Sequence, residues 1–335
     1  MAMERFVVEG GRRLEGTIRP GGNKNAALPI LAACLLTDEP VTLVNVPDIQ
    51  DVRVMLEILE GLGASVERRE RNVVRIVAAG TISPIPDAAL SRRIRASILL
   101  AGSLLARCGS AVITKPGGDV IGRRRVDTHL LALESLGAQI EVSAYEYRMS
   151  AATLRGRRMF LDEASVTATE NAIMAAVLAE GDTLIYNAAA EPHVQDLCRF
   201  LNTLGAQIEG ISTNSLEIHG VESLHGGEFR IPSDHIEVGS YIGLAAITRG
   251  EVLIEDAVPE HLYAIRLMLE KLGVEVRVEG PNVRVPDGQE LRVRYDIGAA
   301  VPKIDDGPWP LFPADLLSIM VVLATQAEGT VMIFE

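Results

Sequence analysis

One loop near the start of the chain has residue types suited to binding an anion. Residues 20–25 read Pro-Gly-Gly-Asn-Lys-Asn and lead into an apolar helix. Glycines let a ligand approach the backbone, and the free N–H groups at a helix start favour negative charge. Either Asn23 or Asn25 could cap this helix. Lys24 is therefore a candidate anion ligand, and a solvent-exposed turn with an incidental lysine is an equally weighted alternative.

A second loop, residues 114–127, reads Thr-Lys-Pro-Gly-Gly-Asp-Val-Ile-Gly-Arg-Arg-Arg-Val-Asp. Its three glycines permit motion, and its arginines precede a helix that we expect to begin near Val126. Guanidinium groups bind phosphate well, and a mobile loop can close over a ligand. Asp119 lies between glycines and near cations, so it could give or take a proton. The loop favours a phosphate site under a lid over the alternative, a solvated basic loop with a structural aspartate.

Two more charged residues stand at the start of an apolar helix, as Lys24 does. Arg95 lies in Ser-Arg-Arg-Ile-Arg-Ala-Ser, whose Arg92 and Arg93 are better explained as surface residues. Asp315 follows Trp-Pro-Leu-Phe-Pro-Ala and precedes the last apolar segment. An aspartate at this place commonly caps a helix, and it could also act as a general base.

Composition excludes several classes of protein. The chain has 335 residues, of which 48% are hydrophobic, and a net charge of −13, which disfavours a general nucleic-acid binder. Its three cysteines are far apart, and its six histidines show no metal spacing, so each is more simply structural. No Walker A loop, G-x-G-x-x-G after a strand or G-x-S-x-G is present. Without an apolar run of membrane-spanning length or a signal peptide, we expect a cytoplasmic protein with no membrane partner.

Two sequence patterns alternate along the chain and predict its architecture. In the first, an apolar helix ends in Leu-Gly and a strand follows; its glycines, which are 74, 68 and 68 residues apart, are Gly63, Gly137, Gly205 and Gly273. Such a glycine ends a helix in a left-handed conformation. In the second, a helix rich in small residues leads through a turn to a strand, over 30–46, 98–114, 173–188, 243–257 and 320–334. One unit is therefore a helix, a strand, a second helix and further strands.

The two patterns are not equally represented, because the second occurs five times and the first four times. The sequence stops directly after the fifth strand of the second pattern. We therefore expect the native protein to contain at least the rest of a fifth unit, with a degenerate natural end as the alternative. Periodicity alone leaves open whether the units stack as a solenoid or close in threes around a shared core.

Five segments together carry a resemblance to a known family. They read GGNKNAALPILAA, RASILLAG, PGGDVIGRRRVDTHL, NAAAEPHVQDL and FPADL, in this order along the chain. They resemble the UDP-N-acetylglucosamine 1-carboxyvinyltransferases, which are enolpyruvyl transferases of peptidoglycan synthesis. The related shikimate-pathway enzymes fit less well, because their first loop usually has Asp-Lys-Ser where this chain has Asn-Lys-Asn.

The resemblance implies an α/β fold of two domains, the inside-out α/β barrel of the enolpyruvyl transferases, built from repeated β/α units. One domain should span residues 23–232, contain three units and carry the lid loop. The other should combine residues 1–22 with 233–335 and lack its last units, so that the chain is truncated at its C-terminus. The family transfers the enolpyruvyl group of phosphoenolpyruvate to the 3-hydroxyl of UDP-N-acetylglucosamine and releases phosphate. It implies no metal, no organic cofactor, and only these small molecules as partners.

The resemblance also implies roles for individual residues. Lys24 and Arg124 match positions that bind phosphoenolpyruvate and take part in catalysis. Arg95 matches a position near the phosphates, and Asn25 matches a sugar contact. Further substrate contacts are implied for Arg125, Val126, Asp127, Ser165 and Val166.

Two aspartates are implied as the proton-transfer groups. Asp315 matches the residue proposed to deprotonate the attacking hydroxyl and to contact the substrate. Asp119 stands at the lid position that is usually cysteine and is implied to protonate the methylene carbon. Because a carboxylate is not alkylated as a thiolate is, we expect the protein to be insensitive to fosfomycin.

Four positions depart from the family pattern near the substrate. Arg125 replaces a proline, Glu163 a lysine, Thr167 a glycine and Ala190 an arginine. These changes keep two alternatives open. One is a divergent enolpyruvyl transferase with another acceptor, and the other is a homologue that binds a nucleotide sugar without catalysis.

Overall fold

The computed structural model describes residues 5–117 and 126–335. Gly22–Pro232 form one compact unit, here called the larger unit. Ser233–Glu335 and the segment that precedes Gly22 form a second, here called the smaller unit. Among the described residues, no helix is both long enough and apolar enough to cross a lipid bilayer.

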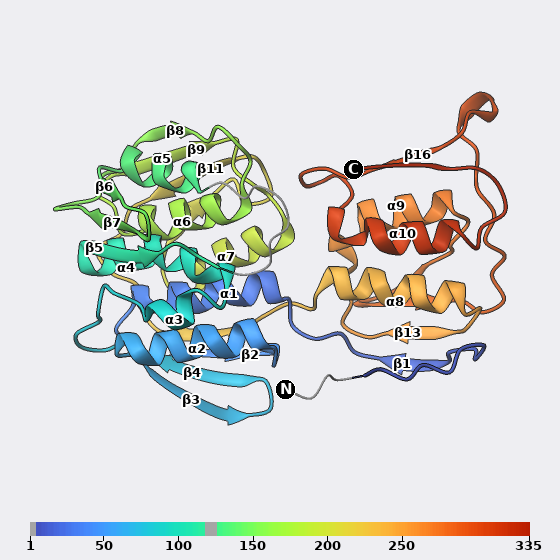
Figure 1. Cartoon of the computed structure of the whole chain (residues 1–335), viewed down its shortest axis with the longest axis horizontal. Helices are drawn as coiled ribbons and strands as arrows, with labels where there is room; N and C mark the ends of the chain where they lie inside the picture. The colour runs from blue at the N-terminus through green and yellow to red at the C-terminus, as the bar shows by residue number, and fades with distance from the viewer. Residues whose placement is uncertain (1–4, 118–125) are drawn as a thin grey trace. The chain divides into compact units, whose positions relative to one another are not determined.

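The larger unit repeats one succession of elements three times: a buried helix, a strand, an amphipathic helix and a pair of antiparallel strands (Figure 1). In chain order it contains α1 (Lys24–Ala33), η1 (Cys34–Leu36), β2 (Val41–Val44), α2 (Gln50–Leu62), β3 (Ser65–Glu70), β4 (Val73–Val77), α3 (Ala88–Ser91), η2 (Arg95–Leu99), α4 (Leu100–Cys108), β5 (Ser110–Thr114), α5 (Asp127–Ser135), β6 (Gln139–Val142), β7 (Glu146–Ser150), β8 (Arg158–Phe160), α6 (Val166–Ala176), β9 (Asp182–Tyr186), α7 (Pro192–Thr203), β10 (Gln207–Glu209), β11 (Ser215–His219) and β12 (Gly227–Arg230).

Three sheets cover this unit, in the orders β12-β2-β4-β3, β5-β7-β6 and β10-β11-β9-β8. The strands of each hairpin pair antiparallel, whereas β12 pairs with β2 and β8 with β9 in parallel. The strand after each buried helix therefore lies against the hairpin that follows it. This agrees with the repeat predicted from the two sequence patterns.

Small residues let the buried helices of the larger unit approach one another closely. Helix α4 contacts both α1 and α6, and every residue of α6 from Ala168 to Ala176 is buried. At Gly102 in α4, a Cβ atom would lie 2.4 Å from the backbone oxygen of Asn171 in α6. The alanines and glycines of the second sequence pattern thus set the separation of these helices.

The predicted Leu-Gly helix ends are confirmed. Gly63, Gly137, Gly205 and Gly273 have φ angles of 109°, 103°, 99° and 81°. These angles are in the left-handed region, which costs a residue with a side chain more than it costs glycine.

The smaller unit repeats the same succession. It contains β1 (Gly16–Ile18), α8 (His235–Ile247), β13 (Val252–Ile254), η3 (Pro259–His261), α9 (Tyr263–Lys271), β14 (Arg277–Glu279), β15 (Asn282–Val285), η4 (Ile297–Ala299), β16 (Lys303–Asp305), η5 (Ala314–Leu316), α10 (Leu317–Ala324) and β17 (Met332–Phe334). Its sheets have the orders β1-β13-β15-β14 and β16-β17.

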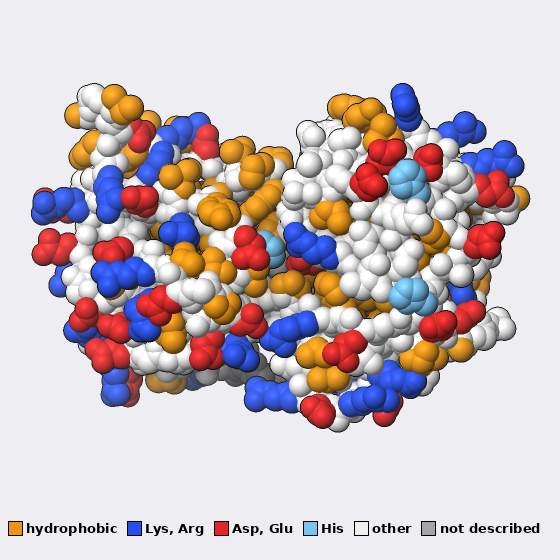
Figure 2. Space-filling model, turned by 180° about the vertical axis from the view of Figure 1, so that it is seen from behind, with side chains coloured by type: hydrophobic (Ala, Val, Ile, Leu, Met, Phe, Trp, Pro, Cys, Tyr) orange, Lys and Arg blue, Asp and Glu red, His pale blue; other side chains and the backbone are white. Residues whose placement is uncertain are grey.

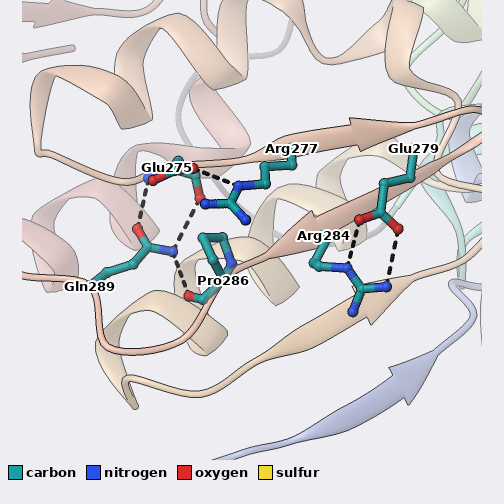
Figure 3. A network of polar contacts seen from close by, with 6 residues as sticks. All are labelled: Glu275, Arg277, Glu279, Arg284, Pro286 and Gln289. Carbon is teal, nitrogen blue, oxygen red and sulfur yellow. Dashed lines mark hydrogen bonds and ion pairs between the residues drawn. The ribbon is translucent and has the colours of Figure 1, made fainter.

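Polar contacts hold the β14–β15 hairpin of the smaller unit (Figure 3). Arg284 makes a two-pronged ion pair with Glu279, with N···O distances of 2.6 and 3.1 Å. The Gln289 side chain accepts from the backbone N–H of Glu275 and donates to the carbonyl oxygens of Glu275 and Pro286.

On the face drawn in Figure 2, basic and acidic side chains are interspersed.

Candidate functional site

Lys24 is the first residue of α1, and the chain before it is tightly held. The Asn23 side chain caps the helix by accepting from the N–H groups of Asn25 and Ala26 at 2.8 and 3.3 Å. Of the two possible caps, Asn23 is therefore the one used, and the Asn25 side chain is half-buried and is not the cap. A Cβ atom on Gly22 would lie 1.8 Å from the Asn45 carbonyl oxygen, so only glycine fits there.

The ammonium group of Lys24 is exposed at the helix start. Its Nζ lies 3.9 Å from the Asp51 carboxylate in α2, and both side chains are nearly half exposed. An ion pair of this length and exposure is weak. The lysine therefore remains accessible to an anionic ligand.

Arg95 is the first residue of η2, which contacts both α1 and α6. Arg92 and Arg93 are exposed, and Arg93 pairs with Glu57 at 3.4 Å, as expected for surface residues. Arg95 is half-buried, and its charge contributes to lowering the pKa of His129 in α5. The structure therefore brings Arg95 to the part of the larger unit where α1, α5 and α6 lie.

The loop predicted to be a lid is described only at its two ends. Asp119, Arg124 and Arg125 lie outside the described residues. On the incoming side, a Cβ atom on Gly117 would lie 1.9 Å from the Arg92 carbonyl oxygen, so the loop starts directly on the backbone before η2. On the other side, Val126 is the N-cap residue of α5, where the helix start was predicted.

Four predicted substrate contacts lie at the starts of α5 and α6, which contact each other. Val126 and Asp127 begin α5, and Ser165 and Val166 begin α6. Thr128 donates a hydrogen bond to Asp162 at 2.7 Å, just before α6. His129 Nε2 lies 3.0 Å from Thr167 Oγ1, in the first turn of α6. The two helix starts are therefore bound to each other twice.

Asp315 lies in the smaller unit, in the single turn η5 that precedes α10. Its side chain is exposed. The cap positions of η5 and α10 are Pro313 and Leu316, and neither makes a side-chain capping bond. The alternative that Asp315 is the helix cap is wrong, because the residue falls inside the turn and not before it.

The two remaining departures from the family pattern have different surroundings. Glu163 is exposed two residues before Ser165. Ala190 is buried, and its carbonyl oxygen accepts from the Gln195 side chain at 2.8 Å.

Glu170 in α6 is fully buried, and its Oε1 has no hydrogen-bond partner among the described residues. Burial, assisted by the charge of Glu191, raises the pKa of Glu170 well above its ordinary value.

Comparison with known proteins agrees with this arrangement. A family model described as EPSP synthase (3-phosphoshikimate 1-carboxyvinyltransferase) matches residues 8–335. A UDP-N-acetylglucosamine 1-carboxyvinyltransferase of Treponema denticola is 54% identical over 99% of this chain and 78% of its own length. One of the same name from Bradyrhizobium diazoefficiens is 55% identical over 100% of this chain and 78% of its own length.

The chain belongs to the UDP-N-acetylglucosamine 1-carboxyvinyltransferase family. Solved structures of two enolpyruvyl-transferring enzymes support the fold. NikO of Streptomyces tendae, an enolpyruvyl transferase, superposes with a TM-score of 0.83 at 24% identity, over 97% of this chain and 75% of that one. EPSP synthase of Acinetobacter baumannii gives 0.73 at 19% identity, over 97% and 74%. The predicted enolpyruvyl transferase fold is therefore confirmed.

Within this family framework, the structure adds residues that sequence reasoning did not select. Asp51 lies 27 residues further along the chain than Lys24, and its carboxylate is 3.9 Å from the lysine Nζ. The sequence interprets His129 as structural, and its contacts with Thr167 and Asn171 join it to α6, whose first residues are predicted substrate contacts. The four described residues of α5 and α6 that are predicted as substrate contacts carry no sequence signal that Thr167 and Asn171 would bind His129.

No group of three or more His, Cys, Asp or Glu residues able to hold a metal ion occurs within residues 5–117 and 126–335. Burial raises the pKa of the Cys198 thiol to about 12, and it raises the pKa of Cys34 further. Neither thiol is therefore in the reactive thiolate form at neutral pH.

Proposed function

We propose that the protein transfers the enolpyruvyl group of phosphoenolpyruvate to the 3-hydroxyl of UDP-N-acetylglucosamine, releases phosphate, and so acts in peptidoglycan synthesis in the cytoplasm. The observation that carries this proposal is the identity above 50%, over almost the whole chain, with curated enzymes of that name. The proposed reaction uses these two small molecules and no metal or organic cofactor. We propose the larger unit, at about residues 23–232, as the domain that carries the lid.

The proposed chemistry needs cations around phosphoenolpyruvate, which carries a carboxylate and a phosphate. Lys24 at the start of α1 and Arg95 at the start of η2 are the described candidates, and Arg124 is the candidate in the lid. Their positive charges would stabilise the negative charge of the substrate and of the departing phosphate. The exposure of Lys24 and its weak pairing with Asp51 support this role.

Proton transfer accompanies each step of the proposed reaction. Asp315 would accept the proton of the 3-hydroxyl, whose oxygen then forms a bond to C2 of phosphoenolpyruvate. Asp119 would give a proton to C3, so that a tetrahedral ketal with a methyl group results. The ketal would then lose a proton from that methyl group and break its C2–O bond to phosphate, which leaves the enolpyruvyl ether.

Phosphate release from phosphoenolpyruvate, measured with and without UDP-N-acetylglucosamine, tests the proposal. Release should require both substrates and be lost in Asp119→Ala. Lys24→Gln should lower kcat/KM for phosphoenolpyruvate about 100-fold, the usual effect of removing one group that stabilises developing charge. Lys271→Gln is the matched control, because this lysine binds the Lys303 carbonyl oxygen within the smaller unit.

The same assay separates the alternatives. Release with a different hydroxyl acceptor, and none with UDP-N-acetylglucosamine, would favour a divergent transferase. Binding of the nucleotide sugar without release from any acceptor would favour a non-catalytic homologue. The exposed Glu163 carboxylate beside Ser165 is the observation that motivates the acceptor panel, because it disfavours an anion at that helix start.

A further inference from the structure

Two lysines in the described part of the chain lie over aromatic rings, and they differ in their partners. Lys303 Nζ is 4.8 Å from the centre of the Phe334 ring, and its ammonium group also pairs with the Asp305 carboxylate. Lys115 Nζ is 5.7 Å from the centre of the Tyr147 ring, and no described carboxylate pairs with it. A cation–π contact does not neutralise the ammonium charge, so Lys115 remains able to bind an anion.

The ring beneath Lys115 carries a hydroxyl group that the fold does not use. Tyr147 lies on β7, opposite Ile113 of β5, and is only 8% exposed. Its hydroxyl makes no hydrogen bond with any other residue that the structure describes. A buried tyrosine hydroxyl normally has a hydrogen-bond partner, and the lack of one costs free energy. The Tyr147 hydroxyl is therefore available to a ligand.

Charged groups from two further elements act on this hydroxyl. Burial raises the pKa of Tyr147, the positive charge of Arg95 in η2 lowers it, and the negative charge of Asp127 in α5 raises it. Of the two charges, Arg95 has the larger effect. The hydroxyl keeps its proton at neutral pH and can donate a hydrogen bond. Two of the three charged groups, Lys115 and Arg95, are positive, so the surroundings favour an anion that accepts hydrogen bonds.

Paired strands of one sheet hold Lys115 and Tyr147 beside each other. The Lys115 N–H donates to the Tyr145 carbonyl oxygen at 2.8 Å, which joins the residue after β5 to the turn between β6 and β7. One residue earlier, Thr114 of β5 pairs with Glu146 of β7. The ammonium group and the hydroxyl are therefore brought together by the fold of the larger unit.

We propose that Lys115 and Tyr147 form a binding site for a phosphate group, in which the ammonium supplies charge and the hydroxyl donates a hydrogen bond. One phosphate group has enough oxygen atoms to accept from both at once. The site is built from a strand and from the residue after a strand, and not from a helix start. The resemblance assigns a role to neither residue, so the inference goes beyond the proposed function.

Titration calorimetry with inorganic phosphate and the full chain tests this site. Tyr147→Phe removes the hydroxyl and keeps the ring under Lys115, whereas Lys115→Gln removes the charge. Each variant should bind phosphate about 10-fold more weakly, as expected for the loss of one bond to a charged group. Lys303→Gln is the matched control for the lysine, because its ammonium group is already paired with Asp305. Tyr145→Phe, 76% exposed on the same hairpin, is the control for the tyrosine.

Further ligands identify the source of the phosphate group. Phosphoenolpyruvate, UDP and uridine are titrated in the same way into wild type and both variants. A loss for phosphoenolpyruvate with unchanged UDP affinity would show that the site takes a phosphate monoester, and the reverse would show that it takes the phosphates of a nucleotide. Uridine carries no phosphate, so its affinity should stay within about twofold of wild type.

Several results would overturn the inference. Unchanged affinity of both variants for every phosphate-bearing ligand would mean that the two groups face only solvent. A loss in Lys115→Gln with none in Tyr147→Phe would show a long-range effect of charge and no built site. An equal loss for uridine would place the effect outside the phosphate. If wild type binds inorganic phosphate but neither phosphoenolpyruvate nor UDP, the proposed function fails while the site stands, which is a distinct result.

Discussion

Asn171 accepts a hydrogen bond from the backbone N–H of Gly102 at 2.7 Å and so joins the middle of α6 to α4. The bond requires the two helix backbones to lie almost in contact, since a Cβ atom on Gly102 would be 2.4 Å from the Asn171 backbone oxygen. Because Asn171 also binds His129, the packing of two buried helices determines the position of a side chain behind the candidate site.

Gly102→Ala should therefore destabilise the protein. The added methyl group meets backbone and not a flexible side chain, so the helices must separate, which costs about 1–3 kcal/mol or more. Urea unfolding followed by circular dichroism measures the change. Gly61→Ala in α2 is the control, because a Cβ atom there meets open space. It should stabilise by about 0.5–1 kcal/mol, and a loss as large as that of Gly102→Ala would contradict the packing argument.

The buried His129 predicts a loss of stability in acid. Its pKa is about 3 in the folded protein and 6.5 as the ordinary value, so the unfolded chain binds the proton more readily. The contribution of His129 to the free energy of unfolding is complete above pH 6.5. Below pH 6.5 this free energy falls by about 1.4 kcal/mol for each pH unit, until the pH reaches the pKa of His129 in the folded protein. His129→Gln should remove this dependence. The free energy of unfolding at pH 7 and pH 5 gives the comparison, and identical pH slopes for the two proteins would refute it.

Glu170 predicts the opposite pH dependence. Its folded pKa lies well above the ordinary 4.5, so the folded state holds a proton that the unfolded chain releases. The contribution of Glu170 to the free energy of unfolding is complete below pH 4.5, and it is lost as the pH rises through the pKa of Glu170 in the folded protein. Glu170→Gln, which is neutral throughout, should be more stable than wild type at pH 8, by on the order of 1–3 kcal/mol. Differential scanning calorimetry at pH 5 and pH 8 tests this, with the exposed Glu209→Gln as control.

Fosfomycin labelling tests the assignment of Asp119 to the lid. The wild-type protein should show no adduct in an intact-mass spectrum, whereas Asp119→Cys should gain a single one. Cys34 and Cys198 are buried, and Cys108 is half-buried. Burial raises the pKa of all three thiols, so they should not react while the protein is folded. An adduct on wild-type Asp119, or none on Asp119→Cys under conditions where it releases phosphate, would contradict the assignment.

The sequence was most informative where a feature depends on local backbone geometry. The Leu-Gly pattern predicted four helix ends, because a left-handed residue needs glycine whatever surrounds it. It also predicted the order of elements, since alternation and helical spacing act over short distances. The sequence did not distinguish Asn23 from Asn25 as the helix cap. The extended backbone of Asn23 and the hydrogen bonds that its side chain accepts identify it as the cap.

Sequence reasoning was weakest for contacts made between distant segments. His129 looks like any core histidine, and its role follows from Thr167 and Asn171, which are 38 and 42 residues away. Asp51 was not selected for the same reason. Asp315 was assigned a possible capping role by its position before a helix, but a turn of 3-10 geometry shifts the cap positions to its neighbours.

The repeated helices separate what the protein needs to fold from what it is proposed to do. Lys24 is exposed at the head of α1, and the residues that follow, from Ala26 to Ala33, are all buried. Asp315 is exposed beside Leu316 and Leu317, which are buried. A substitution at Lys24 or Asp315 changes the charge at the surface and leaves the buried core residues unchanged. Substitutions at these two exposed positions are therefore expected to alter ligand binding, whereas substitutions in the buried helix interiors are expected to alter stability.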